Sequence, residues 1–594
     1  MEDSLAAAVR AALARFPDLP ADFDPQTVEV AFETPNDPSH GDLATNVALQ
    51  LAKPLRRAPR AIAEGIAAHI ALDPATVAAV EIAGPGFLNI RFASDHLQAG
   101  LADILAAGSD YGRTEGHVGE TALVEYVSAN PTGPLTVGHG RNAVLGDTVA
   151  TLLAWTGYDV RREYYFNDAG RQMRVLGQSV RARYQAIVRP DTPTKTLDDG
   201  LVVPESFPED GYRGDYITEI AQGLADEHGD ALLASDDGWN AAAVAEGQLH
   251  PTGDPDEAGL APFKEAAEAS VFGDIMGALR RLGVRMDSRF NERTLYEGEP
   301  GKVWEVVEQL KAKDLAYEKD GAVWFKTSAL GKTVTTDGEE EGKDVVLVKS
   351  SGEPTYRLPD IAYHLDKLDR ADLVLDVFGA DHIATYPDVI RGVRVLAGDH
   401  AAERIDVVVY QFVTLVRGGQ PVKMSTRKAT YETLDDLMDE VGADVVRFFF
   451  LMRAPGTHLE FDLDLATEAS EKNPVFYLQY AHARIASIER KAAETVPAGT
   501  PDLSLLTHAS EEALVKTLLL FPEEIRQAAE ARAPHRLATF LREVATAFNA
   551  FYRDCRIVGE PDDLATARLA LARAARTVIG NGLTVLGISA PESM

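Results

Sequence analysis

The chain has 594 residues and a formal net charge of −34, and a quarter of its residues are charged. This length allows three or four domains, each with a core of its own. The N-terminus carries acidic residues where a signal peptide has basic ones, and no apolar run approaches membrane-spanning length, so we expect a soluble cytoplasmic protein without a membrane partner. The single cysteine, Cys555, excludes an internal disulfide and a cysteine-rich zinc site.

The negative charge is unevenly distributed along the chain. Residues 191–260 hold 17 acidic residues against two basic ones, whereas the last 94 residues hold 12 acidic and 10 basic. Affinity for RNA comes largely from Lys and Arg on phosphate. Because one acidic segment supplies nearly half of the excess, a basic face can form elsewhere, and the total charge does not exclude a nucleic-acid partner.

Residues 1 to about 110 are predicted to form a separate unit. It comprises an alanine-rich helix, a second helix RAIAEGIAAHI, and the strand-like VEIAGPGFLNIRF, in which Gly84-Pro85-Gly86 makes a hairpin or a bend. Basic residues gather at one helix boundary, namely Lys53, Arg56, Arg57 and Arg60. The residues alone leave open whether this boundary is a solvated helix end or an RNA contact.

The most informative stretch runs from Leu123 to Asp168. LVEYV is typical of a buried strand, SANPTGPLTVGHG of a turn-rich loop, RNAVLGDTVATLLAWTGY of a helix, and DVRREYYF of another strand. This order predicts a βαβ unit, with its loop at the carboxyl end of the first strand, where open α/β sheets bind their ligands.

The loop brings Thr136, Gly138 and His139 to the start of the predicted helix. Unpaired backbone N–H groups and the helix dipole favour phosphate there. Gly138 and Gly140 would let the backbone approach a ligand. The segment therefore predicts a nucleotide site, and the alternative is a tight connection with a capping histidine.

Residues 190–260 are predicted to interrupt the nucleotide-binding fold, since they are rich in Pro, Gly and Asp and only PEDGYRGDYITEIAQGLADEHG has a clear helical period. The fold then resumes with a helix and a hairpin in VWEVVEQLKAKDLAYEKDGAVWF. Asp360 is predicted to begin a helix with an apolar face. The strand LVLDVFGADH ends in Asp381 and His382, a second ligand position by the strand-end rule, with helix capping as the alternative for His382.

From about residue 434 onward the sequence predicts an almost wholly helical bundle. One helix carries Tyr477, Tyr480 and Arg484. These side chains can stack on unpaired RNA bases, or the two tyrosines can belong to the core with Val475 and Leu478.

Two motifs about 285 residues apart resemble the paired signatures of class I aminoacyl-tRNA synthetases. PLTVGHGR is similar to the "HIGH" motif, and Lys423-Met424-Ser425-Thr426-Arg427, which follows the strand-like IDVVVYQFVTLV, is similar to "KMSKS". SANPTGPLTVGHGR with the upstream Glu125 specifically resembles the arginyl-tRNA synthetases, as do the N-terminal HGDLATN and GPGFLNIRF. The C-terminal NPVFYLQYAHARI resembles the start of the anticodon-binding domain that arginyl-tRNA synthetases share with a few related synthetases. The chain departs from both motifs, with Thr136 for the first histidine and Thr426 for the second lysine.

This resemblance implies an α/β fold of three parts: a Rossmann-like class I catalytic domain, an α+β N-terminal domain and an all-α C-terminal helix bundle. The implied boundaries are 1–110 for a tRNA-contacting domain, 111–433 for the catalytic domain with an insertion at about 190–260, and 434–594 for a helical stem and anticodon-binding domain. The implied enzyme is an arginine–tRNA ligase, which activates L-arginine with ATP and Mg²⁺ and transfers it to the 3′ end of tRNA(Arg). Another class I synthetase and a catalytically silent tRNA-binding paralogue stay open as alternatives, and a monomer is expected.

The resemblance also implies roles for individual residues. The residues with implied catalytic roles are Thr136, His139, Lys423, Arg427 and Lys428. The residues implied to contact ATP are Gly138, His139, Gly140, Asp381, His382, Lys423, Met424 and Ser425, and no resident metal site is implied. The residues implied to contact arginine are Glu125, Ser128, Asn130, Tyr356, Asp360 and Asp381. The residues implied to contact tRNA are Arg56, Arg57, Arg60, Tyr477, Tyr480 and Arg484.

The acidic residues in the implied arginine pocket suit a guanidinium, whose planar fork of donors pairs with carboxylates. We expect Glu125 and Asp360 to face each other across one cleft, where without a cation between them at least one carboxyl should have a raised pKa.

Overall fold

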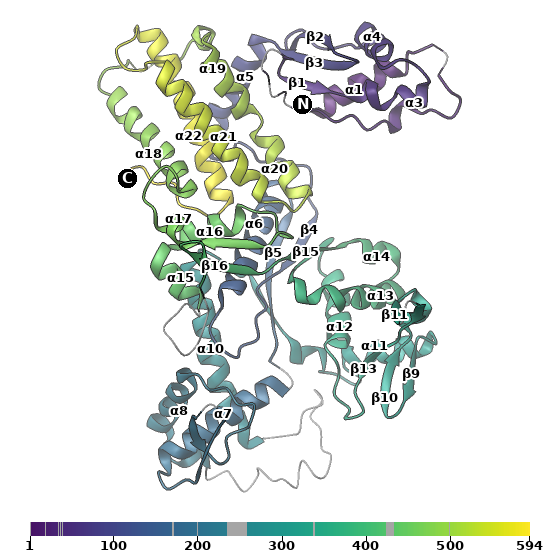
Figure 1. Ribbon diagram of the computed structural model, residues 1–594, viewed down its shortest axis with the longest axis vertical. Helices are drawn as coiled ribbons and strands as arrows, with labels where there is room; N and C mark the ends of the chain where they lie inside the picture. Colours follow the sequence, from purple (N-terminus) through teal and green to yellow (C-terminus); the bar gives the residue numbers. More distant parts are fainter. Residues whose placement is uncertain are drawn as a thin grey trace.

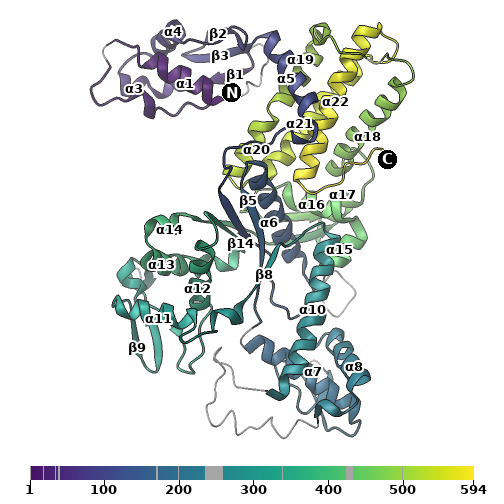
Figure 2. The ribbon, with the colours of Figure 1, turned by 180° about the vertical axis from the view of Figure 1, so that it is seen from behind.

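The computed structural model describes residues 2–17, 19–33, 35, 37, 40–168, 171–198, 200–233, 258–336, 339–422, 433–497 and 499–594. Its centre is a parallel five-stranded sheet in the order β15-β14-β4-β5-β8. The strands are β4 (Thr121–Glu125), β5 (Asp159–Phe166), β8 (Ser288–Asn291), β14 (Leu373–Gly379) and β15 (Ile405–Tyr410). The predicted βαβ unit is confirmed, with α6 (Val137–Trp155) joining β4 to β5. Figure 2 shows α6 lying beside these strands.

Helix α6 is buried on all sides because it lies between the sheet and the C-terminal helices. Its close approach to the chain after β4 depends on Gly146, where a Cβ would lie 2.2 Å from the Tyr126 ring. The helix therefore holds the loop that precedes it in a fixed place at the carboxyl edge of the sheet.

The N-terminal unit is a small antiparallel sheet covered by helices, as the sequence predicted. The sheet has the order β1-β3-β2, and the predicted bend at Gly84-Pro85-Gly86 joins β2 to β3. Its elements are α1 (Glu2–Leu13), β1 (Leu43–Thr45), α2 (Val47–Gln50), α3 (Ala52–Leu55), α4 (Pro59–His69), β2 (Val77–Ala83) and β3 (Phe87–Phe92). Helix α5 (Ser94–Ala107) connects this unit to the rest of the chain, and Figure 1 shows the unit beside α19.

Two lobes project from the carboxyl edge of the sheet (Figure 1). One contains α7 (Arg171–Val188), the hairpin β6 (Thr194–Thr196) and β7 (Val202–Pro204), α8 (Asp215–His228) and the long α10 (Ala261–Arg281). The other contains α11 (Lys302–Ala312), β9 (Ala316–Lys319), β10 (Ala322–Phe325), β11 (Thr333–Thr336), β12 (Glu339–Gly342), β13 (Val345–Val348), α12 (Arg357–Leu368), α13 (Tyr386–Ala397) and α14 (Asp399–Glu403). The second lobe has its own apolar core, which includes Phe325, Leu347 and Leu358.

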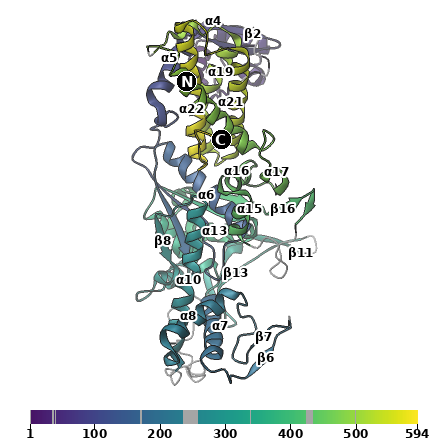
Figure 3. The same ribbon diagram turned by 90° about the vertical axis from the view of Figure 1, so that its left-hand side faces the viewer.

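The C-terminal part is a helix bundle packed on α5 and α6. Its elements are α15 (Leu434–Val441), α16 (Ala443–Leu451), α17 (Leu463–Thr467), α18 (Pro474–Ala492), α19 (Ala509–Leu519), α20 (Phe521–Glu530), α21 (His535–Asp554) and α22 (Asp562–Val585). Figure 3 shows the bundle and the first lobe at opposite ends of an elongated molecule. No helix among the described residues is long and apolar enough to cross a membrane.

The structure adds detail to two local predictions and contradicts a third. The strand-like IDVVVYQFVTLV forms two strands in different sheets, β15 and β16 (Val413–Arg417), and between them the Gln411 carbonyl accepts a hydrogen bond from Arg141. The region after residue 434 is almost wholly helical, as predicted, and among its described residues it contains the short strand β18 (Leu459–Asp462). Strand β18 pairs with β16, which also pairs with β17 (Gln420–Pro421). Asp360 does not begin its helix, because α12 starts three residues earlier and has Tyr356 at its N-cap.

Candidate active site

The backbone is strained where β4 ends. Val127 and Ser128 have φ values of 65° and 39°, which are costly for side chains other than glycine and above all for a β-branched one. Asn142 of α6 holds this segment: its Oδ1 accepts a hydrogen bond from Val127 N at 2.6 Å, and its Nδ2 donates to Val377 O at 2.9 Å. Such strain persists only where its surroundings enforce it, and it gathers at ligand sites. It indicates a site at the carboxyl ends of β4 and β14.

Helix α6 begins with a capping box. Thr136 Oγ1 accepts a hydrogen bond from His139 N at 3.4 Å, and His139 Nδ1 accepts one from Thr136 N at 3.2 Å. Since Nδ1 is the acceptor, the ring hydrogen belongs on Nε2. Burial lowers the pKa of His139, so the ring is a neutral donor near pH 7. The capping alternative raised by the sequence is thus observed, and it fixes the tautomer of the histidine.

The two glycines of this loop differ in their surroundings. A Cβ at Gly138 would meet only Thr136 Oγ1, at 3.7 Å, so the backbone there is open to a ligand. A Cβ at Gly140 would lie 2.5 Å from Leu434 Cδ1 and 3.1 Å from the Phe450 ring. The missing side chain of Gly140 therefore makes room for α15 and α16, and a contact of its backbone with a ligand stays a prediction.

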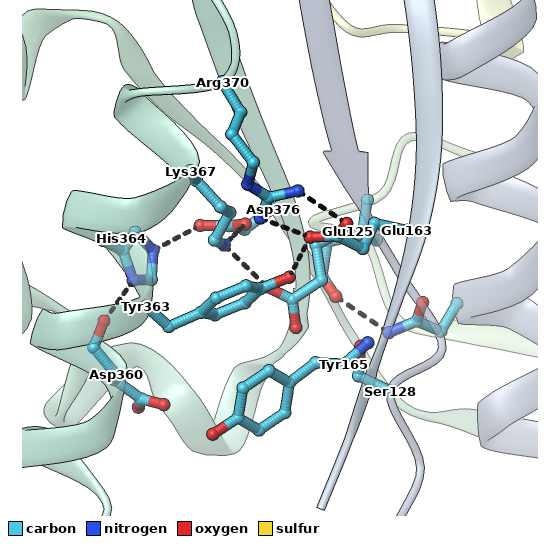
Figure 4. A network of polar contacts seen from close by, with 12 residues as sticks. Glu125, Ser128, Glu163, Tyr165, Asp360, Tyr363, His364, Lys367, Arg370 and Asp376 are labelled. Carbon is cyan, nitrogen blue, oxygen red and sulfur yellow. Dashed lines mark hydrogen bonds and ion pairs between the residues drawn. The ribbon is translucent and has the colours of Figure 1, made fainter. Parts of the chain in front are cut away.

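Three acidic residues lie side by side across the sheet. Glu125 at the end of β4 is in register with Glu163 of β5 and Asp376 of β14. Helix α12 and the turn after it supply their cations (Figure 4). Lys367 Nζ of α12 lies 2.7 Å from Glu125 Oε2 and 2.6 Å from Asp376 Oδ1, and Arg370 of the turn makes two 2.8 Å bonds to Glu163. The sequence analysis did not foresee Lys367 beside Glu125. Its expectation that at least one of Glu125 and Asp360 has a raised pKa agrees with the raised pKa of both.

The shared lysine sets the ionisation of this group. Burial would raise the pKa of Asp376, but Lys367 and His364, whose Nε2 lies 2.7 Å from Asp376 Oδ2, hold it well below its usual range. Burial raises the pKa of Glu125, and Lys367 offsets the rise in part. Burial would lower the pKa of Lys367, but the two carboxylates keep it raised. One cation cannot fully compensate two carboxylates, and Lys367 stabilises the ionised form of Glu125 less than that of Asp376.

A second acidic pair lies beside this group and was missed in part by the sequence analysis. Glu292 follows β8 in the short helix η6 (Glu292–Leu295) and is buried, and Tyr296 donates a hydrogen bond to its Oε1 at 3.3 Å. Burial raises the pKa of Glu292 to about 8, and the nearby charge of Asp360 adds to the rise. Burial likewise raises the pKa of Asp360. The strand-end rule that singled out Asp381 would also have found Glu292.

The other predicted arginine and ATP contacts surround these acids at different depths. Ser128 Oγ accepts a hydrogen bond from Tyr165 N at 3.1 Å, and Asn130 is exposed. Tyr356 is 66% exposed at the start of α12. Asp381 and His382 lie in the short helix η8 (Ala380–Ala384), with exposed side chains 3.7 Å apart, and the charge of His382 reaches Asp360.

The predicted tRNA contacts lie far from the acids, at two surfaces. In the N-terminal unit Arg56 is exposed, Arg57 lies over the Phe16 ring and donates to Pro17 O, and Arg60 pairs with Glu64 at 3.3 Å. On α18 the guanidinium of Arg484 lies 4.5 Å from the centre of the Tyr480 ring, and the Tyr477 hydroxyl accepts a hydrogen bond from Asn549 at 2.9 Å. The structure therefore places both tyrosines partly at the surface rather than wholly in the core.

The residues predicted on the second motif lie outside the described residues. They are Lys423, Met424, Ser425, Thr426, Arg427 and Lys428.

Comparisons with known proteins agree along the whole chain. Three family models match it: "Arginyl tRNA synthetase N terminal domain" over residues 2–92, "tRNA synthetases class I (R), catalytic domain" over 100–200, and "DALR anticodon binding domain" over 478–594. The chain is 58% identical to Arginine–tRNA ligase of Salinibacter ruber, with all of both chains covered. It is 47% identical to Arginine–tRNA ligase of Desulfotalea psychrophila, covering 95% of this chain and 94% of the relative. Thermus thermophilus arginyl-tRNA synthetase has the same fold, with a TM-score of 0.73 over 100% of both chains at 22% identity.

Proposed function

This chain belongs to the arginyl-tRNA synthetase family, and from that premise we propose how its side chains bind the substrates. It is a class I arginine–tRNA ligase, which uses ATP to join arginine to its tRNA. The reaction forms an arginyl-adenylate with release of pyrophosphate and then an ester with the 3′-terminal ribose. The protein positions the reactants and stabilises charge on the phosphates.

Glu292 and Asp360 would bind the guanidinium of arginine. The observation that carries this proposal is that both carboxyls are held at raised pKa by burial, and that Asp360 adds to the shift at Glu292. Two neighbouring acids in a partly closed site repel each other when both are ionised, and a planar cation with five donors removes that cost. Glu125 already has Lys367 as its cation, so it is better suited to the α-amino end of the substrate, together with Ser128 and Asn130.

Tyr356 and Asp381 would complete the arginine site when the substrate is bound. Both are exposed at the rim of the acidic group, on α12 and η8. Side chains at a pocket rim can close over a ligand at the cost of their own rotamer freedom.

Gly138, His139 and the capped start of α6 would hold the ATP phosphates, with Thr136 fixing the histidine. His139 would donate from Nε2 to phosphate oxygen as a neutral group. The ATP would also lie close to Gly140, Asp381 and His382. The second motif would contact its phosphates through Lys423, Met424, Ser425, Arg427 and Lys428. We propose that ATP enters with Mg²⁺, held mainly by phosphate oxygens and water.

The tRNA would be held at both ends of the chain. Two domains would contact the tRNA. The N-terminal domain, residues 1–110, would do so through Arg56, Arg57 and Arg60, and the C-terminal part, residues 434–594, through Tyr477, Tyr480 and Arg484. Residues 111–433 would form the catalytic domain. From the family assignment alone we propose a cytoplasmic monomer.

Substrate discrimination tests the arginine site. In Asp360→Asn and Glu292→Gln, the rate of aminoacylation with arginine should fall by about 10²-fold or more while citrulline stays inactive, because a site built on buried acids depends on its charged partners. Asp369→Asn, at the exposed C-terminal end of the same helix, is the matched control and should behave as wild type. Arginine kinetics in both variants within threefold of wild type would remove these two acids from the site.

A further inference from the structure

Three basic side chains surround one buried carboxylate at the edge of the proposed arginine pocket. Asp388 lies in the first turn of α13 and is fully buried. Lys332 Nζ is 2.6 and 2.8 Å from its two carboxylate oxygens, Arg357 Nε is 3.0 Å from one and Arg391 Nη1 is 3.2 Å from the other. We call these four residues the Asp388 cluster. One carboxylate compensates one cation, so the cluster keeps a surplus of two positive charges in a chain whose net charge is −34.

The Asp388 cluster adjoins the arginine pocket. Arg357 is the first residue of α12, and Asp360 follows three positions later, so the two share one helix face and lie about 4.5 Å apart along its axis. Helix α13 is tied to the same edge, since the Tyr386 ring contacts those of His364 and Phe378, at centroid distances of 6.1 and 5.6 Å. Figure 1 shows α12 and α13 lying together in the second lobe.

The basic side chains of the cluster keep donors for a further ligand. The side chains of Lys332, Arg357 and Arg391 are 16%, 25% and 26% exposed. Each guanidinium has five N–H donors and uses one of its nitrogens on Asp388. The neighbouring Tyr356 exposes two-thirds of its surface to solvent. Proteins typically bind single-stranded nucleic acid in this way: cationic side chains bind a phosphate, and a neighbouring aromatic ring stacks on a base.

We infer that the Asp388 cluster binds a backbone phosphate of the single-stranded 3′ end of tRNA and so holds the terminal ribose beside the arginine pocket. The inference rests on the arginine–tRNA ligase function, because that reaction brings a polyanionic strand to this pocket. The first turns of α12 and α13, which carry Arg357 and Asp388, add their positive dipole ends to the surplus charge. The free phosphates of ATP or pyrophosphate are the other source of the same chemistry, and the experiment separates the two.

The test uses Arg357→Gln and Arg391→Gln in the full-length enzyme. Lys332 stays unchanged because it makes the closest contacts to Asp388. In each variant the Kd for tRNA should rise about tenfold, the effect of one lost charged contact, and the salt dependence of binding should weaken by roughly one unit of slope. The KM values for arginine and ATP in aminoacylation should stay within twofold of wild type. Arg357→Lys should restore most of the affinity, since it keeps the charge.

Truncated tRNA locates the contact. For tRNA lacking its last four nucleotides, wild type and both variants should bind alike, because the contacted phosphate is gone. Lys311→Gln is the matched control, as Lys311 lies in the same lobe, is ion-paired to Glu318 and is exposed. If the Kd for tRNA and its salt dependence are unchanged in both variants, the Asp388 cluster has a purely structural role. If instead the KM for ATP rises, the cluster binds the phosphates of the free nucleotide. Failure of the function itself would show differently, as wild-type enzyme that charges no tRNA.

Discussion

Individual side chains divide the acids at the strand ends into two groups with different tasks. Glu125 and Asp376 share Lys367 within the fold, and this lysine compensates their charge in part before any substrate arrives. Glu292 and Asp360 also have raised pKa values, and the partner we propose for them is the guanidinium of arginine. The second pair gains most from a bound cation, because a guanidinium favours the ionised form that burial disfavours.

Arginine binding should therefore release a proton. Glu292 has a pKa of about 8 in the empty site, so it is mostly protonated at pH 7, and the bound guanidinium should lower that pKa and ionise it. Affinity for arginine should rise with pH up to about 8 and then level off. Calorimetry in two buffers of different ionisation enthalpy should show release of about one proton at pH 7 and almost none near pH 9.5. Glu292→Gln should abolish the release, and a variant that still releases a full proton would place the titration elsewhere.

Among the elements, α6 shows how a helix can be both anchor and ligand platform. Its first turn carries the capping box of Thr136 and His139, and its middle packs so closely on the chain after β4 that residue 146 has to be glycine. The strained segment after β4 depends on the same helix through Asn142. Packing in the middle of α6 thus determines where its first turn lies.

Gly146→Ala should destabilise the protein by about 1–3 kcal/mol, the usual cost of an extra methyl group in a filled core. The added Cβ would meet the Tyr126 ring at 2.2 Å, so either the ring or the helix has to move. The control is Gly223→Ala in α8, where no atom lies within 4 Å of the new Cβ, and where alanine should be neutral or stabilising. Denaturant titrations of both variants compare the two sites. Equal midpoints would show that α6 has room to shift.

For the molecule as a whole, Arg447 joins three separate parts. This fully buried side chain of α16 donates from Nε to Leu586 O at the end of α22, from Nη1 to Leu282 O at the end of α10, and from Nη2 to Asp147 of α6 at 2.7 Å. The bundle, the first lobe and α6 therefore meet at one guanidinium. A separate contact, Lys516 with Asp42 at 2.8 Å, links α19 to the N-terminal unit.

Arg447→Met should destabilise the fold by about 3 kcal/mol, because it leaves two buried carbonyls without their donor and weakens the compensation of Asp147. Arg162, 3.6 Å from Asp147, keeps the cost below that of a wholly unpaired charge. Guanidinium titration measures the loss. Arg553→Met is the control, since its partner is the adjacent exposed Asp554, and its midpoint should match wild type. A wild-type midpoint for Arg447→Met would show that the three parts hold together without this contact.

Local patterns in the sequence were enough to predict the βαβ unit, the hairpin at Gly84-Pro85-Gly86 and the helices of the C-terminal bundle. The spacing of apolar residues and the turn residues between them act within a few positions, so one sequence carries that information. The two motifs predicted a class I synthetase for the same reason, since each is a short run of residues around one turn. Family membership, and with it the arginine–tRNA ligase activity, followed from these short segments.

Only the tertiary structure decided which charges meet. Lys367 lies 242 positions from Glu125, Glu292 lies 68 from Asp360, and Arg447 lies 300 from Asp147. Strand register and helix rotation determine such contacts, and neither is recorded in the local pattern. The same holds for Gly140, whose sequence context suggested a ligand and whose neighbours are Leu434 and Phe450. The kind of chemistry could be predicted from the sequence because motifs are local, whereas the ionisation and orientation of the groups that perform it depend on burial and on neighbours that only the folded chain brings together.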